Sequence, residues 1–211
     1  MRDDPDATDG PPAPRTDGGE RADDGGWTLF ARDIVTSVLA VALVGIYLFA
    51  ISGVWPPMVA IESGSMEPNM EINDLVFVMD NDRFEPGQAY GETGVVTAAN
   101  ASGYSEFGNS GDVIVFTPNG NGDRTPIIHR AMFWVDAGEN WCEQADPEFL
   151  GNNPPSEDRC ETDHAGFITK GDANPTYDQV EEGLSTPVKP GWVVGTAELR
   201  IPGLGWLRLR A

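Results

Sequence analysis

Basic side chains are scarce in this sequence. Its 211 residues contain 13 Lys and Arg against 34 Asp and Glu, which gives a formal net charge of −21. Lys170 and Lys189 are its only lysines. Phosphate contacts need clustered Lys and Arg, so nucleic acid is not expected as a partner. High acidity with so few lysines is typical of proteins from salt-loving archaea, in which counter-ions screen the repulsion between carboxylates.

Histidine and cysteine are as rare, with two residues of each. His129, His164, Cys142 and Cys160 show no metal-ligand spacing, so we expect neither a metal nor another cofactor. The two cysteines lie in a segment rich in Pro, Asn and Glu, where a disulfide would suit a domain outside the cytoplasm. Two unpaired thiols are the alternative.

Large apolar side chains are nearly missing from the first 26 residues, which consist mainly of Asp, Gly, Pro and Ala. Such a segment cannot bury enough surface to offset the entropy of ordering it, so residues 1–33 are predicted to form a disordered acidic tail. Residues 34–55, IVTSVLAVALVGIYLFAISGVW, then run without a charge. As a helix they would be roughly 33 Å long, which predicts a transmembrane anchor in membrane lipid.

A cleaved signal peptide is the alternative for this apolar run, but the run is too long and its N-terminal flank is acidic. Arg32 precedes the run, whereas prolines and Glu62 follow it. The positive-inside rule therefore favours a single-pass protein of the cell membrane, with the N-terminus in the cytoplasm and residues 56–200 outside it.

No long stretch of helical periodicity follows the apolar run. Short segments rich in Val, Ile and Phe are separated by Gly, Pro, Asn and Asp, which predicts a mainly β fold for residues 56–200, either a barrel or a sandwich. The predicted strands are 58–62, 74–80, 94–98, 112–116, 126–135, 166–170 and 192–199. Residues 136–163 have little strand character and three prolines, so they are predicted to be an irregular surface insertion, and residues 201–211 a short tail.

The stretch ESGSMEP, residues 62–68, places two serines around a glycine about ten residues beyond the apolar run. A serine attacks a carbonyl only when a nearby base takes its proton. His129 lies in the β-like run IIHRAMFWV, where a rigid strand can hold its ring, while His164 lies at the edge of the polar insertion. Each feature has an ordinary alternative, because Ser, Gly and Pro are common in loops and a lone histidine is more often structural.

Several motifs occur in one order along the chain. They are SGSMEPNM (63–70), NDLVFV (73–78), GDVIVF (111–116), IIHR (127–130) and ITKGDANPTYD (168–178). Together they resemble the successive boxes of type I signal peptidases, in the archaeal and endoplasmic-reticulum branch where a histidine replaces the bacterial lysine. The resemblance covers about 34–198. It implies a membrane-anchored serine endopeptidase with a β-rich catalytic domain outside the cytoplasm, acting on secretory preproteins.

By position, the resemblance implies that Ser65 is the nucleophile and His129 the general base. Asp172 and Asp178 match the acidic pair of the family. We favour Asp178 as the partner of the histidine and Asp172 as a supporting carboxylate, although the sequence does not separate them. Two departures from the family are the insertion 136–163 and a C-terminal segment too short and too rich in arginine to form the second membrane helix of many archaeal members.

Substrate contacts are predicted around the same serine. Ser63 matches a position whose hydroxyl helps to form the oxyanion hole in bacterial relatives, and Gly64 would let a substrate backbone approach closely. Signal-peptide cleavage sites carry small side chains at alternate positions. An extended substrate paired with residues 58–63 would present these side chains to shallow pockets floored by Val59 and Ile61.

Two other readings of the sequence exist. The first is a non-catalytic, membrane-anchored β-domain of the cell surface, in which SGS is a loop. The second is a self-cleaving repressor-type protease of the same fold. That type uses a lysine base and a DNA-binding domain, so the acidic tail, the apolar run and the IIHR motif all argue against it.

Overall fold

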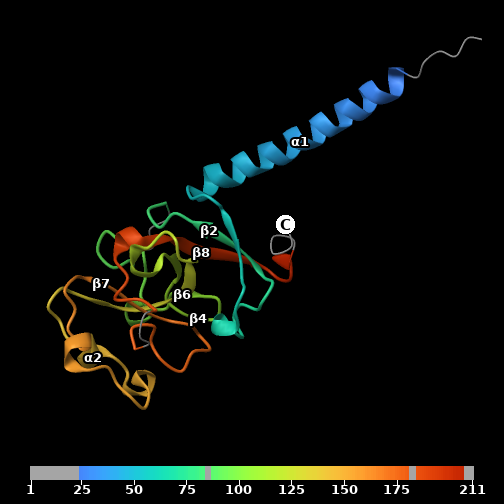
Figure 1. Cartoon of the computed structure of the whole chain (residues 1–211). Helices are drawn as coiled ribbons and strands as arrows, with labels where there is room; N and C mark the ends of the chain where they lie inside the picture. The colour runs from blue at the N-terminus through green and yellow to red at the C-terminus, as the bar shows by residue number, and fades with distance from the viewer. Residues whose placement is uncertain (1–23, 84–86, 181–183, 207–211) are drawn as a thin grey trace, which may run out of the picture. The chain divides into compact units, whose positions relative to one another are not determined.

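The structure is a computed structural model that describes residues 24–83, 87–180 and 184–206 (Figure 1). The chain divides into two compact units, residues 1–43 and 44–211. Most of the predicted tail, residues 1–23, lies outside the described residues, as do residues 207–211 of the predicted C-terminal tail.

An apolar helix, α1 (Asp24–Ser52), is the long helix of the described chain. Its stretch Gly26–Ser52 is 27 residues long with a mean hydropathy of 2.6, which is long and apolar enough to span a membrane. The helix begins ten residues before the predicted start at residue 34, because propagating a helix costs little once its apolar part has formed. It ends three residues before residue 55, where Gly53 adopts a positive φ of 79° and terminates it.

The rest of the described chain is mainly β, as predicted, and antiparallel. Six strands form one sheet in the order β1-β2-β8-β5-β6-β7. They are β1 (Met58–Ala60), β2 (Leu75–Met79), β5 (Val113–Phe116), β6 (Ile127–Val135), β7 (Gly166–Lys170) and β8 (Val193–Ile201), with a small separate hairpin of β3 (Ser105–Glu106) and β4 (Asn109–Ser110). Three register shifts, in the pairs β2–β8, β5–β8 and β6–β7, mark bulges that increase the local twist and bend the sheet over its core.

One predicted strand, 94–98, is not a strand in the structure. Val96 instead exchanges hydrogen bonds with one residue: its N–H donates to a carboxylate oxygen of Asp112 at 2.7 Å, and its carbonyl accepts from the Asp112 N–H at 2.8 Å. The side chains of Val95 and Val96 are fully buried. These two valines are therefore buried in the core but belong to no β-strand.

Short helical turns connect the strands and build the insertion. They are η1 (Gly64–Met66), η2 (Ala98–Asn100), η3 (Pro118–Gly120), α2 (Trp141–Gln144), η4 (Pro147–Leu150), α3 (Glu157–Cys160) and η5 (Pro190–Trp192). The insertion 136–163 contains three of these turns, and its apolar side chains pack into a core cluster that it shares with β6 and β7. Trp141 is fully buried and packs edge-on against Tyr177 of the main domain, with ring centroids 6.1 Å apart. The predicted irregular insertion is therefore a packed element.

Cys142 and Cys160 form a disulfide in the structure, with their Cα atoms 5.3 Å apart and 18 residues apart in sequence. It joins α2 to α3 and closes the insertion on itself. A covalent loop of this length stabilises the folded state mainly by restricting the unfolded chain.

Replacing both cysteines by alanine is expected to lower the free energy of unfolding by about 3 kcal/mol, the contribution of a loop of this size in the chain-entropy model. Thermal unfolding of the detergent-solubilised protein measures it. A reductant should lower the melting temperature of the parent to about that of the double variant. It should leave the melting temperature of the double variant unchanged. An equal melting temperature for parent and variant would show that the disulfide contributes nothing.

Candidate active site

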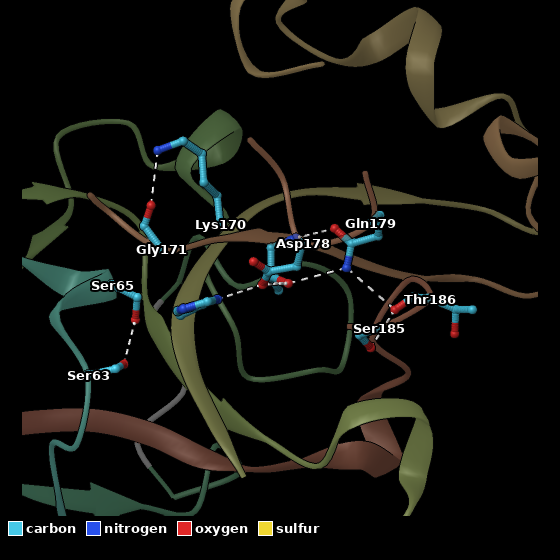
Figure 2. A network of polar contacts seen from close by, with 10 residues as sticks. Ser63, Ser65, Lys170, Gly171, Asp178, Gln179, Ser185 and Thr186 are labelled. Atoms are coloured by element: carbon cyan, nitrogen blue, oxygen red, sulfur yellow. Dashed lines mark hydrogen bonds and ion pairs between the residues drawn. The ribbon is translucent and has the colours of Figure 1, made fainter. Parts of the chain in front are cut away.

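Ser63, Gly64 and Ser65 follow β1 and enter the η1 turn. The hydroxyl oxygens of Ser63 and Ser65 are 3.2 Å apart, and Figure 2 shows the two side chains facing one another. Ser63 is exposed and Ser65 half-buried, while the side chain of Met66 is fully buried beneath them. The turn is thus anchored by an apolar side chain and presents two hydroxyls on its surface.

The backbone of Ser65 is held by the segment that follows β7. The Ala173 N–H donates to the Ser65 carbonyl at 2.9 Å. A Cβ atom at Gly171 would lie 2.6 Å from the same carbonyl oxygen, so only glycine fits at this position. The two motifs SGSM and TKGDAN therefore meet through backbone contact, although about a hundred residues separate them.

His129 lies on β6, and its side chain is 6% exposed. Its Nδ1 atom is 2.7 Å from Oδ2 of Asp178, which is 1% exposed. The same oxygen accepts a hydrogen bond from the hydroxyl of Thr169 at 2.6 Å. A carboxylate can only accept, so this pairing keeps the proton of the neutral ring on Nδ1 and leaves Nε2 as a proton acceptor.

Gln179 fixes the position of Thr169, and through it that of the Asp178 carboxylate. The Gln179 Oε1 atom accepts from the Thr169 N–H at 3.0 Å, and Nε2 donates to the Thr169 hydroxyl at 3.3 Å. Because that hydroxyl accepts from Gln179, its own proton is directed to Asp178. Sequence reasoning did not select Thr169 or Gln179, since a threonine in a strand and a glutamine in a loop carry no signal by residue type.

Asp172 has a different partner from Asp178. Arg130 binds its carboxylate with two parallel hydrogen bonds, from Nε at 2.8 Å and from Nη2 at 2.7 Å, and Asn69 donates to it at 2.7 Å. Burial raises the pKa of Asp172, but these hydrogen bonds and the guanidinium charge outweigh burial and leave the pKa below its ordinary value. Of the two aspartates left open by the sequence, the structure brings Asp178 to His129 and Asp172 to Arg130.

Asp172→Asn is expected to destabilise the protein by about 3–5 kcal/mol at neutral pH, because it leaves the buried Arg130 guanidinium without its counter-charge. A carboxyl with a lowered folded pKa stabilises above its unfolded pKa of about 3.9, and that stabilisation is lost as the pH falls through the folded value. The difference between parent and variant should therefore shrink on acidification below that pH. Thermal unfolding as a function of pH measures it, with the exposed Asp158→Asn as the matched control. A constant difference at all pH values would contradict the prediction.

Ser65 and His129 line the same cavity, which has a volume of about 980 Å³. Its other walls are largely apolar and include Val59 and Ala60 of β1, Val78 of β2, Val115 of β5, Ile127 and Ile128 of β6, and Val194 of β8. Within the described residues no hydrogen bond links Ser65 to His129. In an unliganded site such contacts are often long and tighten when substrate binds.

One predicted substrate contact is wrong. Val59 lines the cavity, but Ile61 is 2% exposed and belongs to a core cluster with Met66 and Met70. The strand β1 ends at Ala60, and the backbone of Ile61 turns to exchange hydrogen bonds with Asn73 and Asp74. In a strand, Val59 and Ile61 would lie on the same face, but the strand ends before Ile61.

The remaining candidate bases lie elsewhere. His164 packs against the ring of Trp192, with ring centroids 5.5 Å apart. Its Nδ1 atom is 3.1 Å from the carbonyl oxygen of Ala165. Lys170 donates to the Gly171 carbonyl at 3.0 Å. Neither residue lines the cavity that holds Ser65.

The site thus combines a hydroxyl, an imidazole and a buried carboxylate around an apolar cavity. A hydroxyl and a base of this kind can carry out acyl transfer when a third group orients the base. No protein-family model matches this chain, and no curated protein matches it either. The function therefore has to be argued from the site itself.

Proposed function

We propose that this protein is a membrane-anchored serine endopeptidase of the type I signal peptidase class, which removes signal peptides from exported preproteins. The proposal rests mainly on one observation, the distance of 2.7 Å between His129 Nδ1 and Asp178 Oδ2. His129 and Ser65 line the same cavity. In this proposal Nε2 of His129 takes the proton of Ser65, and the hydroxyl oxygen attacks the scissile carbonyl. Asp178 stabilises the imidazolium that forms.

The tetrahedral intermediate needs hydrogen-bond donors for its oxyanion. The Ser65 N–H and the Ser63 hydroxyl, whose oxygen is 3.2 Å from that of Ser65, are the donors we assign to it. Return of the proton from His129 to the leaving amine would release the mature protein. A water molecule activated by the same imidazole would then hydrolyse the acyl-enzyme.

The substrate class is proposed from the edge of the sheet and from the cavity walls. β1 is an edge strand of the sheet, so we propose that an extended peptide pairs with its outer edge. Alternate side chains of such a peptide would face walls that include Val59, Ala60 and Ile128, and we propose that small residues are accepted there.

The anchor and the disulfide support the proposed location. The helix α1 is long and apolar enough to span a membrane, and a disulfide persists best outside the cytoplasm. We therefore propose that the N-terminus is cytoplasmic, that the β-domain faces the outside of the cell, and that the acidic chain works in concentrated salt.

Processing of a preprotein by the purified full-length protein in lipid vesicles tests the proposal. Cleavage is expected after a small residue, and replacing either small residue of an A-x-A-like site by a bulky one should block it. The non-catalytic alternative predicts that no preprotein is cleaved at any salt concentration. Cleavage that ignores the bulky substitutions would contradict the proposed substrate class.

A further inference from the structure

Lys170 is buried at the end of β7 and has no part in the chemistry proposed above. The residue is 7% exposed, although a lysine is rarely buried without a partner. Figure 2 shows the ammonium group donating to the carbonyl of Gly171, at 3.0 Å. On its other side, the ammonium lies 4.5 Å from the ring centroid of Phe149, in the η4 turn of the insertion.

Several charged groups surround this ammonium group. The carboxylates of Asp172, Asp178 and Glu148 attract it, whereas Arg130 repels it. Burial lowers the pKa of Lys170, and the two nearby aspartates oppose that effect without cancelling it.

Asp172 and Asp178, the two aspartates near Lys170, differ in their hydrogen-bond partners. Asp172 already holds the guanidinium of Arg130, at 2.7 Å. By contrast, Oδ1 of Asp178 is buried and has no hydrogen-bond partner among the described residues. A buried carboxylate oxygen without a partner is costly, and attraction by the positive charge of Lys170 lowers that cost.

The Gly171 carbonyl connects Lys170 to the serine. This carbonyl accepts from the Lys170 ammonium and also from the Asn174 N–H, at 2.9 Å, which closes a tight turn. The same turn carries the Ala173 N–H that donates to the Ser65 carbonyl. A shift of the Gly171 carbonyl would therefore move the backbone of Ser65.

We propose that Lys170 is a positioning residue, whose ammonium group holds the Gly171–Asn174 turn against Ser65. The inference rests on the proposed function and gives the insertion a part in it, because the insertion supplies the ring of Phe149 that covers the ammonium group. The role differs from that of a general base, since the ammonium group contacts a carbonyl and not the Ser65 hydroxyl.

Lys170→Met tests this role, and Lys189→Met is its matched control. Lys189 is the other lysine of the chain; its ammonium lies 5.0 Å from the ring centroid of Trp192, and it is not among the residues that line the cavity. For Lys170→Met we expect kcat for preprotein cleavage to fall about 10²-fold, the loss typical of a displaced reacting group, with little change in KM. Lys189→Met should keep parental values. A loss confined to KM, or no loss, would overturn the inference.

The pH profile separates positioning from general structural support. The parent should lose activity on the alkaline side as Lys170 loses its proton, at a pH below the ordinary lysine pKa of about 10.4. This limb should be missing in Lys170→Met and displaced to higher pH in Lys170→Arg, whose guanidinium keeps its proton. An alkaline limb that is identical in the parent and in both variants would overturn the inference, and Lys170→Arg decides it if Lys170→Met does not fold.

A third measurement does not depend on cleavage. Hydrogen exchange of the Ala173 amide, which reports its bond to the Ser65 carbonyl, should become faster in Lys170→Met and stay unchanged in Lys189→Met. An unchanged rate in Lys170→Met would refute the positioning role. Because this readout needs no substrate, it tests Lys170 even if the parent cleaves no preprotein, which would refute the proposed function instead.

Discussion

Ser65→Ala is expected to abolish preprotein processing, with a loss in kcat on the order of 10⁶-fold, as when the nucleophile of a serine protease is removed. The variant should fold and stay in the membrane, because the Ser65 side chain is half-buried and its hydroxyl contacts only that of Ser63 among the described residues. The measurement is cleavage of a preprotein by vesicle-bound protein, with melting temperature as the check on folding.

Ser63→Ala is the matched control for this result, since it removes an equivalent hydroxyl 3.2 Å away. If Ser63 donates to the oxyanion, its loss should lower kcat by about 10²–10³-fold, because the backbone N–H of Ser65 remains. The two variants should therefore differ by several orders of magnitude. If Ser65→Ala cleaved preprotein at the parental rate, the proposal of a serine peptidase would be wrong. The alternative of a non-catalytic β-domain would then be favoured.

The mainly β fold could be predicted because its strands are marked by composition. Val, Ile and Phe between turn residues located every strand of the six-stranded sheet. The same composition failed at residues 94–98, where Val95 and Val96 are buried without a partner strand. Apolar side chains indicate that a segment is buried, but not that it pairs with another strand. The sequence therefore could not distinguish residues 94–98 from a strand.

The ends of elements were harder to predict than the elements themselves. The helix α1 extends from its apolar segment into the polar residues before it, and composition alone does not show at which residue it begins. The end of β1 at Ala60 removed Ile61 from the cavity, and that end is set by backbone bonds to residues 73 and 74. Tertiary contacts of this kind are not visible in a local pattern.

The sequence favoured Asp178 over Asp172 as the partner of His129, as the structure has it, but it could not decide between them, for a related reason. Both lie in one polar segment after β7, and both have the chemistry to orient an imidazole. The competing partner is Arg130, next to His129 on β6, and neighbours on a strand point to opposite faces. One aspartate is therefore needed on each face, but only the fold assigns Asp178 to the histidine and Asp172 to the arginine.

Asp178→Asn should lower kcat about 10⁴-fold while leaving the protein folded. The substitution keeps the size of the side chain but removes its charge, so the imidazolium formed by His129 loses its stabilising partner. The carboxamide can also turn its N–H toward Nδ1, which favours the unproductive tautomer of the ring. Cleavage rates of the parent and the variant, compared at a temperature where both are folded, measure the effect.

Asp172→Asn provides the comparison that makes this result specific. It removes the same charge six residues away, from a carboxylate bound to Arg130 and not to the imidazole. We expect it to lose mainly thermal stability, with a much smaller loss of cleavage below its melting temperature, whereas Asp178→Asn should lose mainly cleavage. An unaltered rate in Asp178→Asn together with a large loss in Asp172→Asn would contradict the assignment. It would mean that the contact of 2.7 Å between Asp178 and His129 has no role in proton transfer.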